Sequence, residues 1–146
     1  MSAWASLMLI AGGLFAGGAA TFAWSRVPIW RRMPVREFIG DFDETLRRTD
    51  KVQPALLVVA IVSAAGFALT ADGVARVLAL VGAAGFVVTL AASLAILVPL
   101  QRRIVSTNPA EAKAIGEMRA RWFSGHLGRS MLAVASFVVV AVAATL

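Results

Sequence analysis

The residues of this sequence best suited to chemistry are Trp122, His126 and Arg129. Their spacing of four and three residues places them on one face of a helix, if that helix continues through Gly125 and Gly128. On this interpretation His126 takes a proton from a substrate near neutral pH, and Arg129 stabilises the anion that forms. The alternative is structural: Arg129 anchors the end of a membrane helix, Trp122 lies at the membrane interface and His126 bonds to a nearby carbonyl group.

The composition excludes several other kinds of site. The chain has no cysteine, so disulfides, iron–sulfur clusters and thiolate chemistry are excluded. His126 is the single histidine, so a metal site made of several histidines cannot form within one chain. We therefore expect no metal ion to take part.

The elements that position these residues are expected to lie in a membrane. Hydrophobic residues make up 60% of the 146 residues and charged residues 15%, whereas soluble domains average about 25% charged residues. A domain of this size has too much surface to bury such an apolar excess, so lipid is the expected surrounding. The net charge of +6 would suggest nucleic acid in a soluble protein. Here the Lys and Arg residues lie between apolar runs, where they determine topology, so we expect no nucleic-acid partner.

Four apolar runs have the length of a transmembrane helix, which is about 20 residues with a lower limit of about 17. Helix is the expected form because backbone groups must be satisfied inside the bilayer and the alternation of a β-barrel is missing. The sequence therefore predicts one all-α membrane domain, residues 1–146, built as a bundle of four transmembrane helices. Their approximate ranges are 3–24, 54–70, 77–100 and 130–146. None has an ionisable residue in its interior, which argues against an ion channel or a proton-coupled carrier.

The distribution of Lys and Arg predicts the orientation of the chain. The loop of residues 25–53 has seven of these residues and the loop of residues 101–129 has six, whereas the turn between the second and third helices has Arg76 alone. Because cytoplasmic loops are enriched in Lys and Arg, both long loops are expected inside and both termini outside. We expect a multi-pass protein of the bacterial inner (cytoplasmic) membrane, with anionic lipids as partners of the basic loops.

Each long loop is predicted to hold a short amphipathic helix. In the first loop Pro34 suits a first turn, and the helix is expected to end near Asp50. Its apolar residues recur at steps of three and four: Val35, Phe38, Ile39, Phe42 and Leu46. In the second loop a capping pattern at residues 108–111 begins a helix that is expected to end at Ser124 and Gly125, with Ile115, Met118 and Trp122 on one face. Both helices are expected in the membrane interface, with the apolar side toward lipid.

Small residues recur on two of the expected helices. Gly13 and Gly17 form a GxxxG pair, and Gly85, Thr89 and Ser93 repeat every four residues. Such faces let helices approach closely. We expect them to pack helices within the bundle, and a homodimer seam is the alternative.

The order of elements resembles the anthrone-oxygenase-like family of small bacterial and fungal membrane proteins. The resemblance covers nearly the whole chain and depends on three short features. These are Val98-Pro99-Leu100 at the exit of the third helix, the stretch FIGDFDETLRRTDKVQP at residues 38–54, and the later Trp122, His126 and Arg129. The family commonly has Asn after the proline of the third helix, where this sequence has Gln101.

The resemblance implies oxidation of an anthrone-type polyketide ring to a quinone by dioxygen, without metal, flavin or any other cofactor. It also suggests a role for each candidate residue. His126 would be the base, Arg129 and Gln101 the oxyanion partners, and Trp122 a wall for the flat ring.

Two hypotheses from different classes therefore remain. The first is a cofactor-independent oxygenase that acts on a lipophilic aromatic substrate at the cytoplasmic interface of the membrane. The second is a non-enzymatic membrane subunit or scaffold, whose small-residue faces and basic loops bind a partner protein, anionic lipid or a second copy of the chain. The resemblance favours the first hypothesis.

Overall fold

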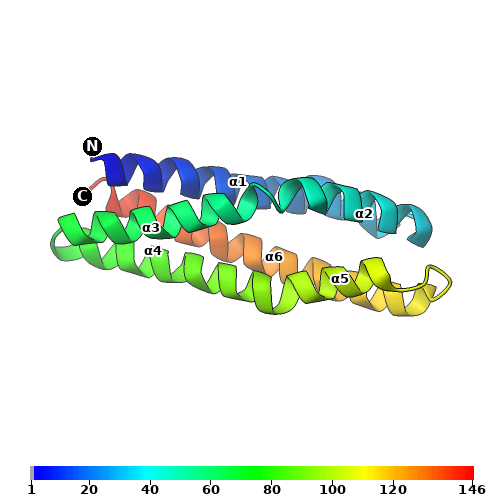
Figure 1. The fold of residues 1–146 in the computed structure, drawn as a ribbon. Coiled ribbons are helices and arrows are strands. Elements are labelled where there is room, and N and C mark those ends of the chain that lie inside the picture. The colour runs from blue at the N-terminus through cyan, green and yellow to red at the C-terminus, as the bar shows by residue number, and fades with distance from the viewer. Residues whose placement is uncertain (1) are drawn as a thin grey trace.

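The computed structural model describes residues 2–146, and these form a bundle of helices with no β-strand among them (Figure 1). The elements in chain order are α1 (Ala3–Arg32), α2 (Val35–Thr49), α3 (Gln53–Thr70), α4 (Gly73–Ala92), the π-helix η1 (Ser93–Leu97), α5 (Val98–Ser106) and α6 (Ala112–Ala143). The all-α prediction is confirmed.

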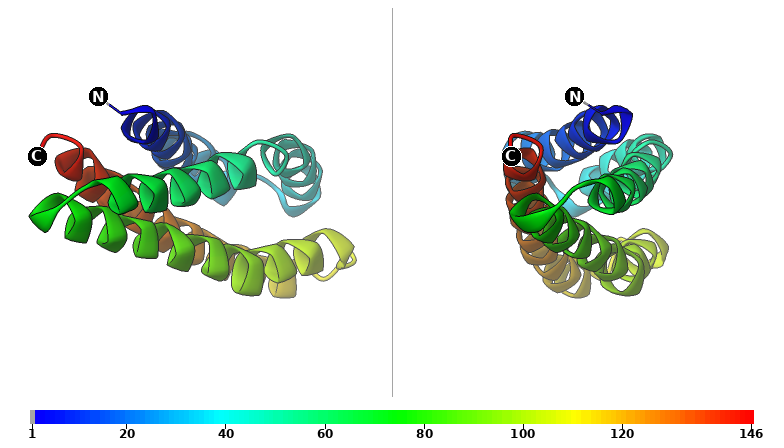
Figure 2. Two further views of the ribbon diagram at one scale, coloured as in Figure 1. Left: turned by 60° about the vertical axis from the view of Figure 1, so that its left-hand side comes forward. Right: turned by 90° about the vertical axis from the view of Figure 1, so that its left-hand side faces the viewer.

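Within residues 2–146, four helical stretches are long and apolar enough to cross a membrane: Ala3–Arg32, Val35–Thr70, Gly73–Ser106 and Ala112–Ala143. Many large apolar side chains on these stretches are exposed, as expected for surfaces that face lipid. The predicted bundle of four transmembrane helices is therefore confirmed. Each helix packs against two neighbours in the order α1, α3, α4, α6 (Figure 2), and both chain ends lie at the same end of the bundle (Figure 1).

Small residues bring α4 and α6 together in the half of the bundle near the termini. A Cβ atom at Gly82 would lie 3.0 Å from the carbonyl oxygen of Ser136, and one at Gly85 would lie 2.1 Å from Ser136 Oγ. Gly13 of α1 packs against Phe137, but a Cβ atom at Gly17 would meet nothing within 4 Å. Most of the predicted small-residue faces therefore serve packing within the bundle, whereas Gly17 lies on an open surface.

A cluster of aromatic side chains fills the other half of the bundle, between α1, α2 and α6. We call Trp30, Phe38, Phe42, Trp122 and Phe123 the aromatic cluster. The apolar face of α2 lies in it, since Phe38, Phe42 and Leu46 are buried against protein. The expected contact of this stripe with lipid is wrong for these three residues, because the ends of α1 and α6 provide the apolar surface that it covers.

The segments expected as loops are largely helical. The first helix continues past residue 24 to Arg32, and α5 extends the third span to Ser106. The separate helix expected to end at Ser124 and Gly125 is wrong, because α6 runs without a break through Gly125 and Gly128. Buried neighbours on both sides of these glycines, Phe123 and Ser130, hold the segment helical despite the weak helix propensity of glycine.

A π-helix interrupts the third span at Ser93–Leu97, where the N–H group of Val98 donates to the carbonyl of Ser93. Pro99 follows, and it lacks the N–H group that would bond to the carbonyl of Ala95 in a regular α-helix. The widened turn accommodates this gap in the hydrogen-bond ladder. Such insertions often occur at functional sites, and this one borders the cavity described next.

Candidate functional site

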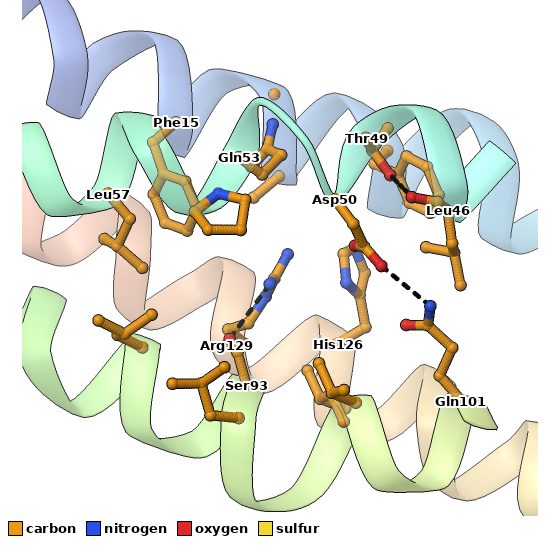
Figure 3. Close-up of a pocket in the computed structure, with 18 of the residues that line it drawn as sticks. Phe15, Leu46, Thr49, Asp50, Gln53, Leu57, Ser93, Gln101, His126 and Arg129 are labelled. Atoms are coloured by element: carbon orange, nitrogen blue, oxygen red, sulfur yellow. Dashed lines mark hydrogen bonds between the residues drawn. The ribbon is translucent and has the colours of Figure 1, made fainter. Parts of the chain in front are cut away.

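A cavity of about 220 Å³ lies between α1, α3, η1 and α6, next to the link between α2 and α3 (Figure 3). Its polar lining consists of Thr49, Asp50, Gln53, Ser93, Gln101, His126 and Arg129, and most of the remaining lining is apolar. Drug-sized ligands occupy cavities of about 300–1,000 Å³. This cavity therefore suits a small ligand, or one that extends partly out of its mouth.

All four residues singled out in the sequence line this cavity. Trp122, His126 and Arg129 come from one face of α6, which is possible because that helix is continuous. Gln101 comes from α5. The structure thus brings the four side chains to one place, while their chemical roles stay predictions.

His126 is held by an aromatic stack. Its ring is 3% exposed and lies parallel to Trp122, with ring centroids 4.9 Å apart and an interplanar angle of 6°. The edge of Phe22 contacts the same imidazole at 5.2 Å between ring centroids. One face of Trp122 is therefore occupied by His126, so Trp122 positions the imidazole as well as lining the cavity.

The hydrogen bonds around His126 leave one ring nitrogen free. Nε2 lies 3.5 Å from Ser130 Oγ, whose single proton goes to the carbonyl oxygen of His126 (2.8 Å) or of Ala19 (3.2 Å). The oxygen of Ser130 can therefore accept the N–H of Nε2. In that tautomer Nδ1 carries the lone pair, and Nδ1 is buried with no partner in the protein.

Arg129 turns its guanidinium group into the cavity and not outward as a membrane anchor would (Figure 3). Nη1 donates to Ser93 Oγ at 3.2 Å, and Cζ lies 5.7 Å from the centroid of the Phe15 ring. In the part of the chain that the structure describes, its side chain forms no ion pair within 4.0 Å of a carboxylate. The charge of Asp50 stabilises this cation at longer range, but no carboxylate contacts the guanidinium group, so the site favours a ligand that brings negative charge or an acceptor oxygen.

Gln101 makes a bond across the mouth of the cavity. Its Nε2 donates to Asp50 Oδ2 at 3.0 Å, which joins α5 to the link between α2 and α3 (Figure 3). Asp50 is exposed. One of the two amide protons of Gln101 is therefore engaged by a carboxylate, and only the other is available to an oxyanion.

Polar atoms without partners gather at this cavity. Among residues 2–146, the buried side-chain atoms with no hydrogen-bond partner are Gln53 Oε1, Trp122 Nε1, His126 Nδ1 and Arg129 Nε. All four residues line the cavity. Leaving such a group unsatisfied costs about 1–3 kcal/mol, so folded proteins keep few of them without a reason. Four residues with unpartnered polar atoms around one cavity indicate a polar ligand.

The polar lining of the cavity lies in a part of the chain that matches a known protein family. The family model described as anthrone oxygenase matches residues 42–139. The chain belongs to the anthrone oxygenase family. No curated protein and no solved structure matches the chain. The matched range contains the polar lining of the cavity from Thr49 to Arg129, whereas Phe15, Gly18 and Phe22 of α1 complete its wall from outside that range.

Four polar residues that line the cavity of this anthrone oxygenase family member were not predicted from the sequence. Thr49, Asp50 and Gln53 lie in the stretch at residues 38–54 that carries the resemblance, but that resemblance depends on the whole stretch and does not single out these side chains. Ser93 was interpreted as a packing residue because of its spacing from Gly85 and Thr89. Within the described residues no three His, Asp or Glu side chains come together as a metal site would require.

Proposed function

We propose that this protein is a cofactor-independent oxygenase that converts a lipophilic, anthrone-type aromatic ketone to a quinone with dioxygen. One observation carries the proposal. In a member of the anthrone oxygenase family, a single cavity is lined by a histidine whose Nδ1 has no partner and by an arginine whose guanidinium group no carboxylate contacts. These groups, a base and a cation, promote removal of a proton from a methylene group that is conjugated with a ring ketone.

The first step is a proton transfer. The proton passes from the ring methylene to Nδ1 of His126, and the electron pair of the broken C–H bond moves through the rings onto the carbonyl oxygen. Arg129 stabilises that oxyanion through its free Nε–H group. The second amide proton of Gln101 adds a further donor, and Trp122 holds the imidazole in place by stacking.

The second step consumes dioxygen. The ring anion passes electrons to dioxygen, a C–O bond forms, and the imidazolium returns its proton to give a hydroperoxide. His126 then removes the second proton from the same carbon, the O–O bond breaks, and a carbonyl group forms. The departing hydroxide takes that proton and leaves as water. One anthrone and one dioxygen give one quinone and one water.

The surroundings of the cavity suit a substrate dissolved in lipid. Leu94 of η1 lines the cavity and is 60% exposed, and Pro54 of α3 lines it and is exposed as well. Asp50 and Gln101 bound the polar side of the same mouth. A lipophilic ring can therefore enter past the apolar side while its oxygen atoms meet polar groups.

We further propose that the cavity lies toward the cytoplasmic face of the bacterial inner membrane, with both termini outside. The distribution of Lys and Arg supports this: seven in residues 25–53 and six in residues 101–129, against Arg76 alone in the opposite turn. Anionic lipids would then surround the basic end. Because the chain has no cysteine, Arg31→Cys and Asp72→Cys can be labelled singly in intact cells. Labelling of Arg31→Cys from outside would contradict this orientation.

The test of the activity is turnover by purified protein in lipid nanodiscs. We expect anthrone to give anthraquinone, followed by its absorbance, with one dioxygen consumed for each quinone in an oxygen electrode. Ser124→Ala, an exposed position on α6, is the matched variant and should turn over like the wild type. Quinone formation no faster than in protein-free nanodiscs would contradict the proposal and favour the non-enzymatic membrane subunit.

A further inference from the structure

An open groove of about 770 Å³ lies between α5 and α6, at the end of the bundle opposite the termini (Figure 1). The reaction proposed above does not use it. Its charged lining comes from Arg103 of α5 and from Glu111, Glu117 and Arg121 at the start of α6. Two cations and two carboxylates therefore border one space, and within residues 2–146 none of the four forms an ion pair.

Glu117 and Arg121 differ from the other carboxylate–arginine pairs of the same spacing. A carboxylate four residues before an Arg favours an ion pair in a helix, and the chain has four such pairs. Three of them form the ion pair: Asp43–Arg47, Glu44–Arg48 and Asp72–Arg76. The fourth pair, Glu117 and Arg121, stays open, and both residues line the groove. Both charges are therefore available to a ligand.

The order of the groups along the groove matches the order in a phospholipid. Because α5 and α6 run antiparallel and are joined by a short link, the groove extends from the membrane outward to that link (Figure 1). Leu100 and Arg121 lie toward its membrane end, and Glu117 lies one turn further out on α6. One turn below Leu100, Ile96 is 60% exposed and offers an apolar surface. From the membrane outward, a ligand meets first an apolar wall, then a cation and then a carboxylate.

We propose that this groove binds one phospholipid of the phosphatidylethanolamine class. Its phosphate accepts from Arg103 and Arg121, because the guanidinium fork matches phosphate oxygens. Its primary ammonium group donates to Glu117, and its acyl chains lie along the apolar surface below. Phosphatidylglycerol has no ammonium group, and phosphatidylcholine has methyl groups in place of the N–H donors. Neither of these lipids can donate an ammonium N–H to the carboxylate.

Native mass spectrometry of the purified protein tests this proposal. The wild type is mixed with equal amounts of phosphatidylethanolamine, phosphatidylcholine and phosphatidylglycerol that have the same acyl chains, so that only the headgroup differs. We expect the ethanolamine lipid to bind about tenfold more tightly than either of the others, the effect of one charge-assisted hydrogen bond.

Variants assign the preference to the groove. Glu117→Gln removes the negative charge at the same length and should lose most of the preference for the ethanolamine lipid. Arg121→Gln should weaken binding of all three lipids, because each has a phosphate. Glu44→Gln is the matched control, since the carboxylate of Glu44 is exposed on α2 and pairs with Arg48; it should keep the preference. Thermal unfolding shows whether each variant is folded.

The other outcomes overturn the proposal. Equal binding of the three lipids by the wild type, or an unchanged preference in Glu117→Gln, contradicts it. A preference for phosphatidylglycerol would mean that the arginines select negative charge alone. An equal loss in Glu44→Gln would assign the preference to the total charge of this end of the bundle. None of these results depends on quinone formation, so the lipid site and the oxygenase are tested separately.

Discussion

The aromatic cluster and the cavity use the same residue types in opposite ways. Within the aromatic cluster Trp30 Nε1 donates to Asp41 Oδ2 at 2.5 Å, whereas Nε1 of Trp122, the member of the cluster that also lines the cavity, has no partner. Arg119 donates to the carbonyl oxygens of Trp30 (3.1 Å) and Met33 (2.9 Å) at the end of α1. Arg129 has one bond, to Ser93, and a free Nε.

This difference separates structural from functional side chains on one helix. Arg119 and Trp122 lie within three residues of each other on α6, and Arg129 lies two turns further along it. Where every polar atom is paired inside the protein, the side chain stabilises the fold. Where polar atoms are left without partners around a cavity, the fold carries a cost that a ligand can offset. Substitutions should therefore affect stability at one site and activity at the other.

The largest effect on stability is expected at Trp30. Trp30→Ala removes a fully buried indole from the aromatic cluster and leaves Asp41 with Arg26 as its remaining partner. Such truncations cost about 3–5 kcal/mol, so the variant should unfold at a much lower denaturant concentration, or fail to accumulate. Unfolding in detergent, followed by circular dichroism, measures this. A loss below about 1 kcal/mol would mean that the cluster does not stabilise this end of the bundle.

The two arginines should respond in opposite ways. Arg119→Met leaves two carbonyl groups at the end of α1 without their charged donor, and should lower the free energy of unfolding by about 1–3 kcal/mol. Arg129→Met removes a half-buried cation that no carboxylate contacts, and should leave stability unchanged or higher. Its kcat should fall by about 10²–10³-fold, as when one oxyanion donor is removed. The comparison fails if Arg129→Met is the less stable of the two or keeps full activity.

The smallest effect on stability is expected at Trp122. Trp122→Phe keeps an aromatic ring against His126 and removes the unpartnered N–H group. We expect a change within about 1 kcal/mol in the free energy of unfolding, because the packing lost is offset by the removal of a buried donor. A larger loss would show that the indole nitrogen has a partner that stabilises the fold, and would place Trp122 with Trp30.

The bundle could be predicted from the sequence because an apolar run can be recognised locally, without knowledge of distant contacts. The thickness of the bilayer sets the length that such a run needs in order to span it. The continuation of α1 to Arg32 and of α6 through Gly125 could not, since both depend on contacts between distant segments. Arg119 caps the end of α1 from α6, and the aromatic cluster holds the glycine-containing part of α6 in a helix.

The candidate site was likewise predictable in part, where its residues lie on one helix, and not where they come from different helices. Helical spacing alone brought Trp122, His126 and Arg129 together. Gln53 could not be predicted as a cavity residue because its position depends on Gly18 of another helix. Ser93 could not be predicted because a π-helix determines the direction of its side chain. The partner of Gln101 also had no local signal, since Asp50 lies 51 residues away in the chain.

The most direct test of the central claim is turnover by His126→Ala in nanodiscs, measured as anthraquinone formed and dioxygen consumed beside the wild type. If Nδ1 of His126 is the base, kcat should fall by about 10²–10⁴-fold. Because His126→Ala also removes a buried ring that stacks on Trp122, His126→Phe, which keeps an aromatic ring there without a base, is measured beside it and should lose activity to the same extent. Full activity in folded His126→Ala protein would contradict the account, because proton removal would then not depend on the imidazole.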